Sequence, residues 1–328
     1  MVTKEEEGIN LIDLREPVQL GESTQWIRIR AASARNPLLL LVQQGPGLPM
    51  INEVRTFERA LSLEDDFTVV YWDQRGCGRS LRSADATRDL SVQTMVSDTG
   101  RLLAMLCDRF DRPAVVAGFS MGAMIAARAA ARRPDLVATL VAVSMDIDGA
   151  AAGKNAYEFA LAAARARQNR RAVRQLTAIG PAPHLTPEGF ATRRRWANNF
   201  GGVRIGQTYN SMARGLLASL LRSPDYSLAD AVRAIRGIPA TTAAVLPELE
   251  ALDLTATLPR LDCPVVMVQG RHDQVAPGSA AERYAEVLTA PSKQFVWFEH
   301  SAHMPQLDEP GRFRELLAKV RLGLPANS

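Results

Sequence analysis

The sequence predicts an α/β fold, in which a mostly parallel sheet is covered by helices on both faces and interrupted by an all-helical insertion. Short apolar runs alternate with amphipathic stretches in the first part of the chain, which is the pattern of strands connected by helices. The alternation stops near residue 146 and resumes near residue 259. We therefore expect a core formed by residues 1–145 and 259–328, with residues 146–258 forming a helical cap inserted into it.

The strands before the insertion are predicted from continuous apolar runs or from apolar residues at every second position. They are expected at residues 25–30, 37–42, 67–72, 114–118 and 136–143. Helices are predicted where apolar residues recur every three or four positions or where alanine dominates. They are expected at residues 52–61, 91–110 and 123–132.

The insertion is rich in alanine and arginine and shows no strand pattern. After it, the sheet pattern resumes. Strands are predicted at residues 264–268 and 294–298, and helices at residues 279–288 and 311–322.

Composition and charge limit the classes of function. The chain has 328 residues, of which 47% are apolar and 23% are charged, so it is long enough to bury a full core. Residues 151–240 contain 14 Lys or Arg against 4 Asp or Glu, a local balance of +10. These arginines are interleaved with alanine and leucine at helical spacing, which indicates solvated helix faces and argues against a nucleic-acid partner.

The sequence also predicts a cytoplasmic protein without a membrane partner. The first seven residues are polar and acidic and lack the features of a secretory signal, and the apolar run 38–42 is too short to span a bilayer. Cys77, Cys107 and Cys263 are widely spaced and odd in number, which predicts free thiols. We expect neither a metal nor a cofactor.

Ser120 is the predicted nucleophile. It lies between a predicted strand and a predicted helix, with Gly118 before it and Gly122 after it. This is the pattern of a nucleophile elbow, a sharp turn that exposes the serine hydroxyl and directs the amide of the next residue, Met121, toward a developing oxyanion.

A serine nucleophile needs a base and an acid. His303 follows the last predicted strand and is the expected base, with His300 in the same loop as its main rival. Asp273 follows the strand at 264–268 and is the expected acid that orients the imidazole. The order Ser120, Asp273, His303 is that of α/β-hydrolases.

An oxyanion hole needs a second amide, expected in the loop after the strand at 37–42. That loop reads Gln-Gln-Gly-Pro-Gly at 43–47, and the amide of Gly45 is the predicted donor. The glycine-rich run at 73–80 lacks the spacing of a nucleotide-binding loop, so we expect it to shape the loop beside the site.

Together, the run at 73–80, the Gly-Pro-Gly loop, the elbow at Ser120, and the segments around Asp273 and His303 resemble the proline iminopeptidase family of α/β-hydrolases. The resemblance covers roughly residues 20–145 and 258–320. It implies a helical cap over the active site, a Ser120-Asp273-His303 triad, oxyanion amides at Gly45 and Met121, and no cofactor.

The chain departs from the family pattern in three places. Gly-Phe-Ser-Met-Gly stands at 118–122 where members usually have Gly-Gly-Ser-Trp-Gly. Gln43-Gln44 stands where members usually have His-Gly, and the Trp-Glu pair of the family's aminopeptidases is missing, since Trp196 is followed by Ala-Asn. A cap this basic disfavours a cationic amine unless Glu158, Glu188, Glu248 or Glu250 faces inward.

The sequence therefore predicts a serine hydrolase that cleaves an ester, lactone or amide of a small molecule or short peptide through an acyl-enzyme. An aminopeptidase and an esterase for a bulkier substrate are both open. The alternative class keeps the fold without hydrolysis, as a lyase, a cofactor-free haloperoxidase or a ligand-binding receptor.

Overall fold

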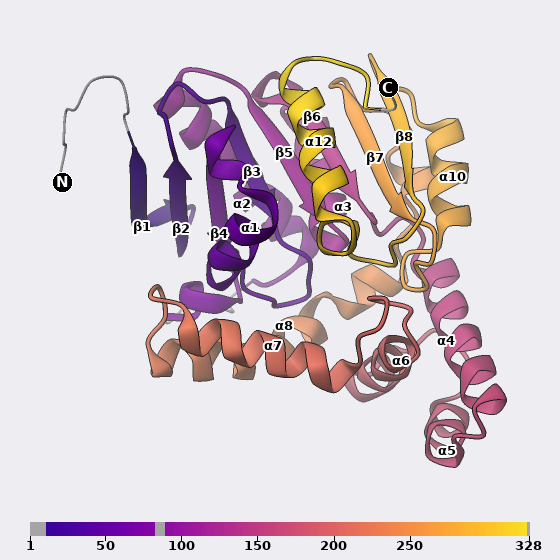
Figure 1. The fold of residues 1–328 in the computed structure, drawn as a ribbon. Coiled ribbons are helices and arrows are strands. Elements are labelled where there is room, and N and C mark those ends of the chain that lie inside the picture. The colour runs from indigo at the N-terminus through magenta and orange to yellow at the C-terminus, as the bar shows by residue number, and fades with distance from the viewer. Residues whose placement is uncertain (1–10, 83–88, 327–328) are drawn as a thin grey trace.

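A single sheet organises the protein. The computed structural model describes residues 11–82 and 89–326, and within them eight strands pair in the order β1-β2-β4-β3-β5-β6-β7-β8 (Figure 1). The strands are β1 (Ile12–Leu20), β2 (Ser23–Ala31), β3 (Leu38–Val42), β4 (Thr68–Asp73), β5 (Ala114–Phe119), β6 (Val137–Val143), β7 (Val265–Gly270) and β8 (Lys293–Phe298). The acidic opening at residues 1–7 lies outside the described residues.

The sheet is mostly parallel. β1 pairs antiparallel with β2, and β2 pairs antiparallel with β4. Every further neighbour pair, from β4-β3 to β7-β8, is parallel. The carboxyl ends of β3 to β8 therefore lie along one edge of the sheet, which is where ligands bind in such folds.

Helices cover both faces of the sheet. Those outside the insertion are α1 (Val54–Leu61), α2 (Val92–Phe110), α3 (Met121–Arg132), α10 (Gly278–Val287), α11 (Pro305–Asp308) and α12 (Pro310–Arg321). Short 3₁₀ turns are η1 (Ile51–Glu53), η2 (Leu63–Asp65), η3 (Gly78–Arg82) and η4 (Pro134–Leu136).

The central strands are buried on both sides. On β3, Leu38, Leu40 and Val42 pack into the apolar cluster that includes α2, α3 and α10. The alternate residues Leu39 and Leu41 pack into a second cluster with α1 and α12. Because successive side chains of a strand point to opposite faces, a continuous apolar run such as this one must lie between two helical layers.

The inserted segment is entirely helical apart from its connecting loops. It consists of α4 (Gly149–Ala166), α5 (Arg170–Ile179), α6 (Pro187–Asn199), α7 (Tyr209–Arg222), α8 (Leu228–Glu250) and α9 (Leu254–Thr257). Figure 1 shows α4 to α8 gathered beyond one end of the sheet. Among the described residues, no helix is both long and apolar enough to cross a membrane.

The predicted α/β architecture is confirmed, with one strand missed. β1 is an edge strand whose residues are mostly exposed, with only Val18 and Leu20 buried, and Pro17 lies within it. A strand with one solvated face and a proline lacks the apolar run that reveals central strands. Pro305 begins the short helix α11, where its missing amide donor leaves no helical hydrogen bond unmade.

Asp73, at the carboxyl end of β4, joins three parts of the chain. Its buried carboxylate accepts hydrogen bonds from the amides of Met50 (2.8 Å) and Ile51 (3.0 Å) in the loop after β3. It also accepts one from the amide of Arg79 (2.7 Å) and one from the hydroxyl of Tyr226, which belongs to the inserted segment. Burial raises the pKa of Asp73, and these four donors oppose that rise.

Asp73→Asn is expected to lower the free energy of unfolding by about 1–3 kcal/mol, because an amide nitrogen would face donors that now bind a carboxylate. Urea denaturation measures the change. Asp262→Asn is the matched control, since that side chain is 54% exposed and its loss should change stability by less than about 0.5 kcal/mol. Equal unfolding midpoints for the two variants would contradict this role of Asp73.

Candidate active site

Ser120 lies in a strained turn between a strand and a helix. Ser120 directly follows β5 and precedes α3, with φ of 52° and ψ of −124°. A side chain rarely adopts a positive φ, so the surrounding structure must hold the turn. The Ser120 amide donates to the carbonyl of Val143 at the end of β6 (2.9 Å), which ties the turn to the neighbouring strand.

The two glycines of the elbow are required by close packing. A Cβ on Gly118 would collide with the backbone of Ala123 in α3. A Cβ on Gly122 would collide with the carbonyls of Val42 and Gln43 at the end of β3. Any larger residue would push α3 away from the sheet edge and displace the serine.

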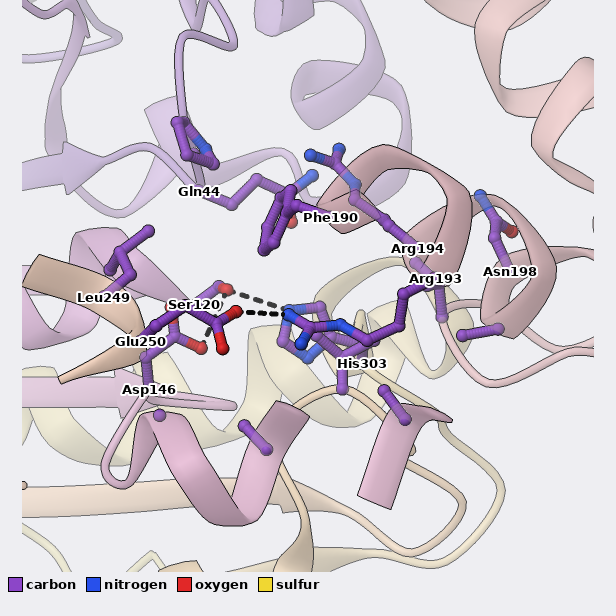
Figure 2. Close-up of a pocket in the computed structure, with 18 of the residues that line it drawn as sticks. Gln44, Ser120, Asp146, Phe190, Arg193, Arg194, Asn198, Leu249, Glu250 and His303 are labelled. Atoms are coloured by element: carbon purple, nitrogen blue, oxygen red, sulfur yellow. Dashed lines mark hydrogen bonds and ion pairs between the residues drawn. The ribbon is translucent and has the colours of Figure 1, made fainter. Parts of the chain in front are cut away.

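Ser120, His303 and Asp273 form a continuous chain of contacts. His303 Nε2 lies 2.9 Å from Ser120 Oγ, and His303 Nδ1 lies 2.8 Å from Asp273 Oδ2. All three are buried, with exposed fractions of 7%, 7% and 4% for Ser120, His303 and Asp273. A ring protonated on Nδ1 donates to the carboxylate and leaves Nε2 free to accept the serine proton. Figure 2 shows the Ser120–His303 contact.

Asp273 is fixed by its own loop. Its Oδ1 accepts the amides of Val275 (2.8 Å) and Ala276 (2.9 Å). Its Oδ2, which faces His303, also accepts from the side chain of Gln269 (3.2 Å). With every lone-pair direction engaged, the carboxylate has one orientation, and that orientation sets the plane of the imidazole.

The pKa of His303 is raised above its usual 6.5. Burial favours the neutral ring, but the charge of Asp273 and its hydrogen bond favour the imidazolium more strongly, and the charge of Asp146 adds to them. A raised pKa makes the ring a stronger base toward the Ser120 hydroxyl.

The other histidines lie elsewhere. His272 and His300 are exposed. His184 is buried in the inserted segment, where its ring contacts the carbonyl of Gly180 and the guanidinium of Arg193. Of the two loop histidines considered from the sequence, the structure therefore brings His303, not His300, to Ser120.

The inserted segment holds the loops that carry the acid and the base. The His303 amide donates to the carbonyl of Val203 (3.0 Å), and the Gln274 amide donates to the carbonyl of Gly202 (3.1 Å). Arg204 forms an ion pair with Asp308 in α11 (2.9 Å). The position of His303 thus depends on the loop between α6 and α7.

Gly45 and Met121 lie next to each other beside Ser120. A Cβ on Gly45 would meet the methyl group of Met121, and Gly45 lines the same cavity as Ser120. Within residues 11–82 and 89–326, neither the Gly45 amide nor the Met121 amide donates to a protein acceptor. Free amides on two residues beside a serine are what an oxyanion hole requires.

A cavity of about 130 Å³ opens above Ser120 and His303. The sheet edge supplies one wall, with Gln44, Gly45 and Pro46 of the loop after β3. Residues of the inserted segment supply the other wall; among them are Ala152, Phe190, Arg194, Asn198, Met212 and Leu249. The site is thus formed between the sheet and the inserted helices, as Figure 2 shows.

Asp146 is a site residue that the sequence reasoning missed. It lines the cavity, and its Oδ1 lies 3.5 Å from Ser120 Oγ. Burial raises its pKa to about 6, with His303 lowering it and Asp273 raising it. The signal was present, because Asp146 follows β6 by three residues and so lies at the same sheet edge as Asp273.

Glu250 is the inward-facing member of the four glutamates considered above. Glu158, Glu188 and Glu248 are exposed, whereas the Glu250 side chain is only 4% exposed and lines the cavity. It forms a 2.7 Å ion pair with Arg193, so its charge is already matched by a buried cation.

No group of three or more His, Cys, Asp or Glu side chains suited to a metal ion occurs in the described parts of the chain. Cys77, Cys107 and Cys263 are buried and unpaired. The prediction of free thiols therefore agrees with the structure.

Residues 37–310 match the family described as alpha/beta hydrolase fold. The chain belongs to this family. It is 26% identical to a probable aminopeptidase, YbaC, of Bacillus subtilis, over 94% of this chain and 96% of that protein.

Solved structures agree with this assignment at the level of the fold. The crystal structure of VinJ matches with a TM-score of 0.66 at 20% identity, covering 95% of this chain and 99% of that one. Proline iminopeptidase of Mycobacterium smegmatis matches with a TM-score of 0.62 at 20% identity, covering 94% and 98%. The predicted resemblance to proline iminopeptidases is confirmed, as is the prediction of a hydrolase.

Asp146→Asn is expected to lower the pKa of His303, because removing a nearby negative charge destabilises the imidazolium. The titration of the His303 ring, followed by proton NMR, should then have its midpoint at a lower pH than in the unaltered protein. Asp148→Asn is the control: it also lines the cavity, its cap of α4 is retained by asparagine, and it should leave the midpoint in place. An unchanged midpoint in Asp146→Asn would contradict the electrostatic link.

Proposed function

We propose that the protein is a serine hydrolase that cleaves an ester, lactone or amide of a small molecule or short peptide through an acyl-enzyme. The observation that carries the proposal is the unbroken contact from Ser120 Oγ through His303 to Asp273 at the floor of a cavity. Without the imidazole, a serine hydroxyl at neutral pH is a poor nucleophile.

In the first half-reaction, Ser120 Oγ attacks the substrate carbonyl while its proton passes to His303 Nε2. Asp273 stabilises the imidazolium through the hydrogen bond to Nδ1. The tetrahedral oxyanion accepts hydrogen bonds from the amides of Gly45 and Met121. When the intermediate collapses, the bond to the leaving group breaks, and His303 returns the proton to the departing oxygen or nitrogen.

In the second half-reaction, water attacks the acyl group on Ser120, and His303 takes its proton. The intermediate collapses to release the acid, and the proton returns to Ser120 Oγ. The proposed cycle needs the substrate, one water molecule and the chain's own residues.

We propose further that the inserted helices act as a cap that determines the substrate. They supply one wall of the cavity, and their loop at 202–204 holds the loops of Asp273 and His303. The names of relatives point to aminopeptidases, but Glu250 is paired with Arg193 and is not free to receive an amine. Esters and lactones therefore remain as strong candidates as aminoacyl amides.

A non-hydrolytic role on the same fold is less well supported. A receptor that only binds its ligand has no need of an oriented imidazole or of free oxyanion amides beside a strained serine. The combination of all three features favours turnover.

The proposal also includes a cytoplasmic location and no nucleic-acid or membrane partner. The exclusion of nucleic acid rests on the arginines of the inserted segment, which are spread over several helices. Many of these arginines are already paired or stacked, for example Arg167 over Phe200 and Arg204 with Asp308.

Ser120→Ala is expected to reduce hydrolysis by roughly four orders of magnitude or more, because it removes the nucleophile while leaving the fold intact. A screen over p-nitrophenyl esters, lactones and aminoacyl arylamides measures the loss. Ser144→Ala is the matched control, since Ser144 is a buried serine that follows the neighbouring strand β6 and lies outside the triad. Full activity in Ser120→Ala would refute the proposal.

A further inference from the structure

Arg194 is a positive charge in the cavity that the proposed chemistry does not use. It lies on α6 and lines the same cavity as Ser120 and His303. In the view of Figure 2, its side chain and that of Gln44 extend toward each other across the cavity, and Asp146 lies on the other side of Ser120.

The Arg194 guanidinium has no partner within the described ranges 11–82 and 89–326. It makes neither a hydrogen bond nor an ion pair there. Arg194 is only partly exposed, and burial lowers the pKa of its guanidinium, whereas the charges of Tyr209 and Asp146 act to raise that pKa. A partly buried cation without a counter-charge costs free energy, and an anion bound beside it would offset that cost.

The neighbouring arginines, Arg193 and Arg195, have partners within the protein. Arg193 pairs with Glu250 (2.7 Å) and also contacts His184 Nδ1 (3.1 Å). Arg195 stacks over the ring of Tyr209, with 5.5 Å from its guanidinium carbon to the ring centroid, and does not line the cavity. Of three consecutive arginines, Arg194 is therefore the one free to meet a ligand in the cavity.

We propose that Arg194 binds a carboxylate of the substrate, so that the enzyme acts on esters, lactones or amides that carry a second, anionic group. This inference rests on the proposed function and names its substrate class. A guanidinium presents two parallel N–H groups that match the two oxygens of a carboxylate, which makes this pairing both strong and specific.

Gln44 adds a neutral donor on the facing wall. Its backbone amide is occupied by the side chain of Gln43 (2.9 Å), but within the described ranges its own side-chain amide has no partner. The family pattern has glycine here, so this side chain is an addition of this chain. A carboxylate at Arg194 places an acceptor in front of it.

Asp146 does not take the place of the substrate carboxylate at Arg194. It lies against Ser120 Oγ and its charge acts on His303. Of the two described arginines that line the cavity, Arg193 is paired with Glu250, so Arg194 is the cation left for a substrate carboxylate.

Two matched pairs of esters test the proposal. Monomethyl adipate and methyl adipamate carry either a carboxylate or a neutral amide on the acyl side. The pair 4-acetoxybenzoate and 4-acetoxybenzamide carry the same two groups on the leaving-group side. We expect kcat/KM to favour the carboxylate in at least one pair by roughly tenfold to a hundredfold.

Arg194→Met should remove this preference, mainly through a higher KM for the carboxylate substrate, so that the ratio of kcat/KM between the two members of a pair approaches one. Arg194→Lys keeps the positive charge but lacks the two parallel N–H donors of the guanidinium, so it should retain part of the preference. This variant keeps the inference testable if the methionine variant folds poorly. Arg195→Met is the matched control, since it removes an equal charge from the same helix outside the cavity, and it should leave the preference intact.

Calorimetry of Ser120→Ala with the same compounds separates this inference from the proposed function. Tighter binding of the carboxylate than of the amide, lost on adding Arg194→Met, supports the site even if no ester is hydrolysed. Hydrolysis without preference for either carboxylate, or equal losses on both members of a pair in Arg194→Met, would overturn it.

Discussion

The strained turn at Ser120 is the constraint on which the rest of the site depends. Its positive φ points the serine side chain out of the sheet edge, and no local sequence preference maintains such a conformation. It is maintained by the hydrogen bond to Val143 and by glycines at 118 and 122, which let α3 pack directly against the ends of β3 and β5. The packing of the sheet domain thus offsets the backbone strain at Ser120.

Parallel pairing then brings the other groups to the serine. β3, β5, β6, β7 and β8 end along the same edge, so residues far apart in sequence meet there: Gly45, Ser120, Asp146, Asp273 and His303. The inserted segment is bound to these same loops, through Val203 at His303 and Tyr226 at Asp73. The placement of the inserted segment and the position of His303 are therefore linked by a hydrogen bond.

Sequence patterns were informative wherever burial or turn chemistry left a local signature. The apolar runs located the central strands, and the order and context of Ser120, Asp273 and His303 identified residues that prove to be in contact. β1 was not predicted because an exposed edge strand lacks a continuous apolar run. Asp146 was missed although its place just after β6 offered a signal. Arg194 and the pairing of Arg193 with Glu250 were not predicted because they depend on how helices pack across the cavity, which periodicity does not encode. The same limit applies to substrate choice, which resides in that wall.

The most direct test of the account is peptide mapping by mass spectrometry after treatment with a fluorophosphonate, which reacts preferentially with a serine activated by a neighbouring base. The account predicts a single adduct, on the peptide that contains Ser120, and its loss when His303 is replaced by alanine. An adduct on another serine, or an unmodified Ser120 in a protein that still hydrolyses esters, would contradict it.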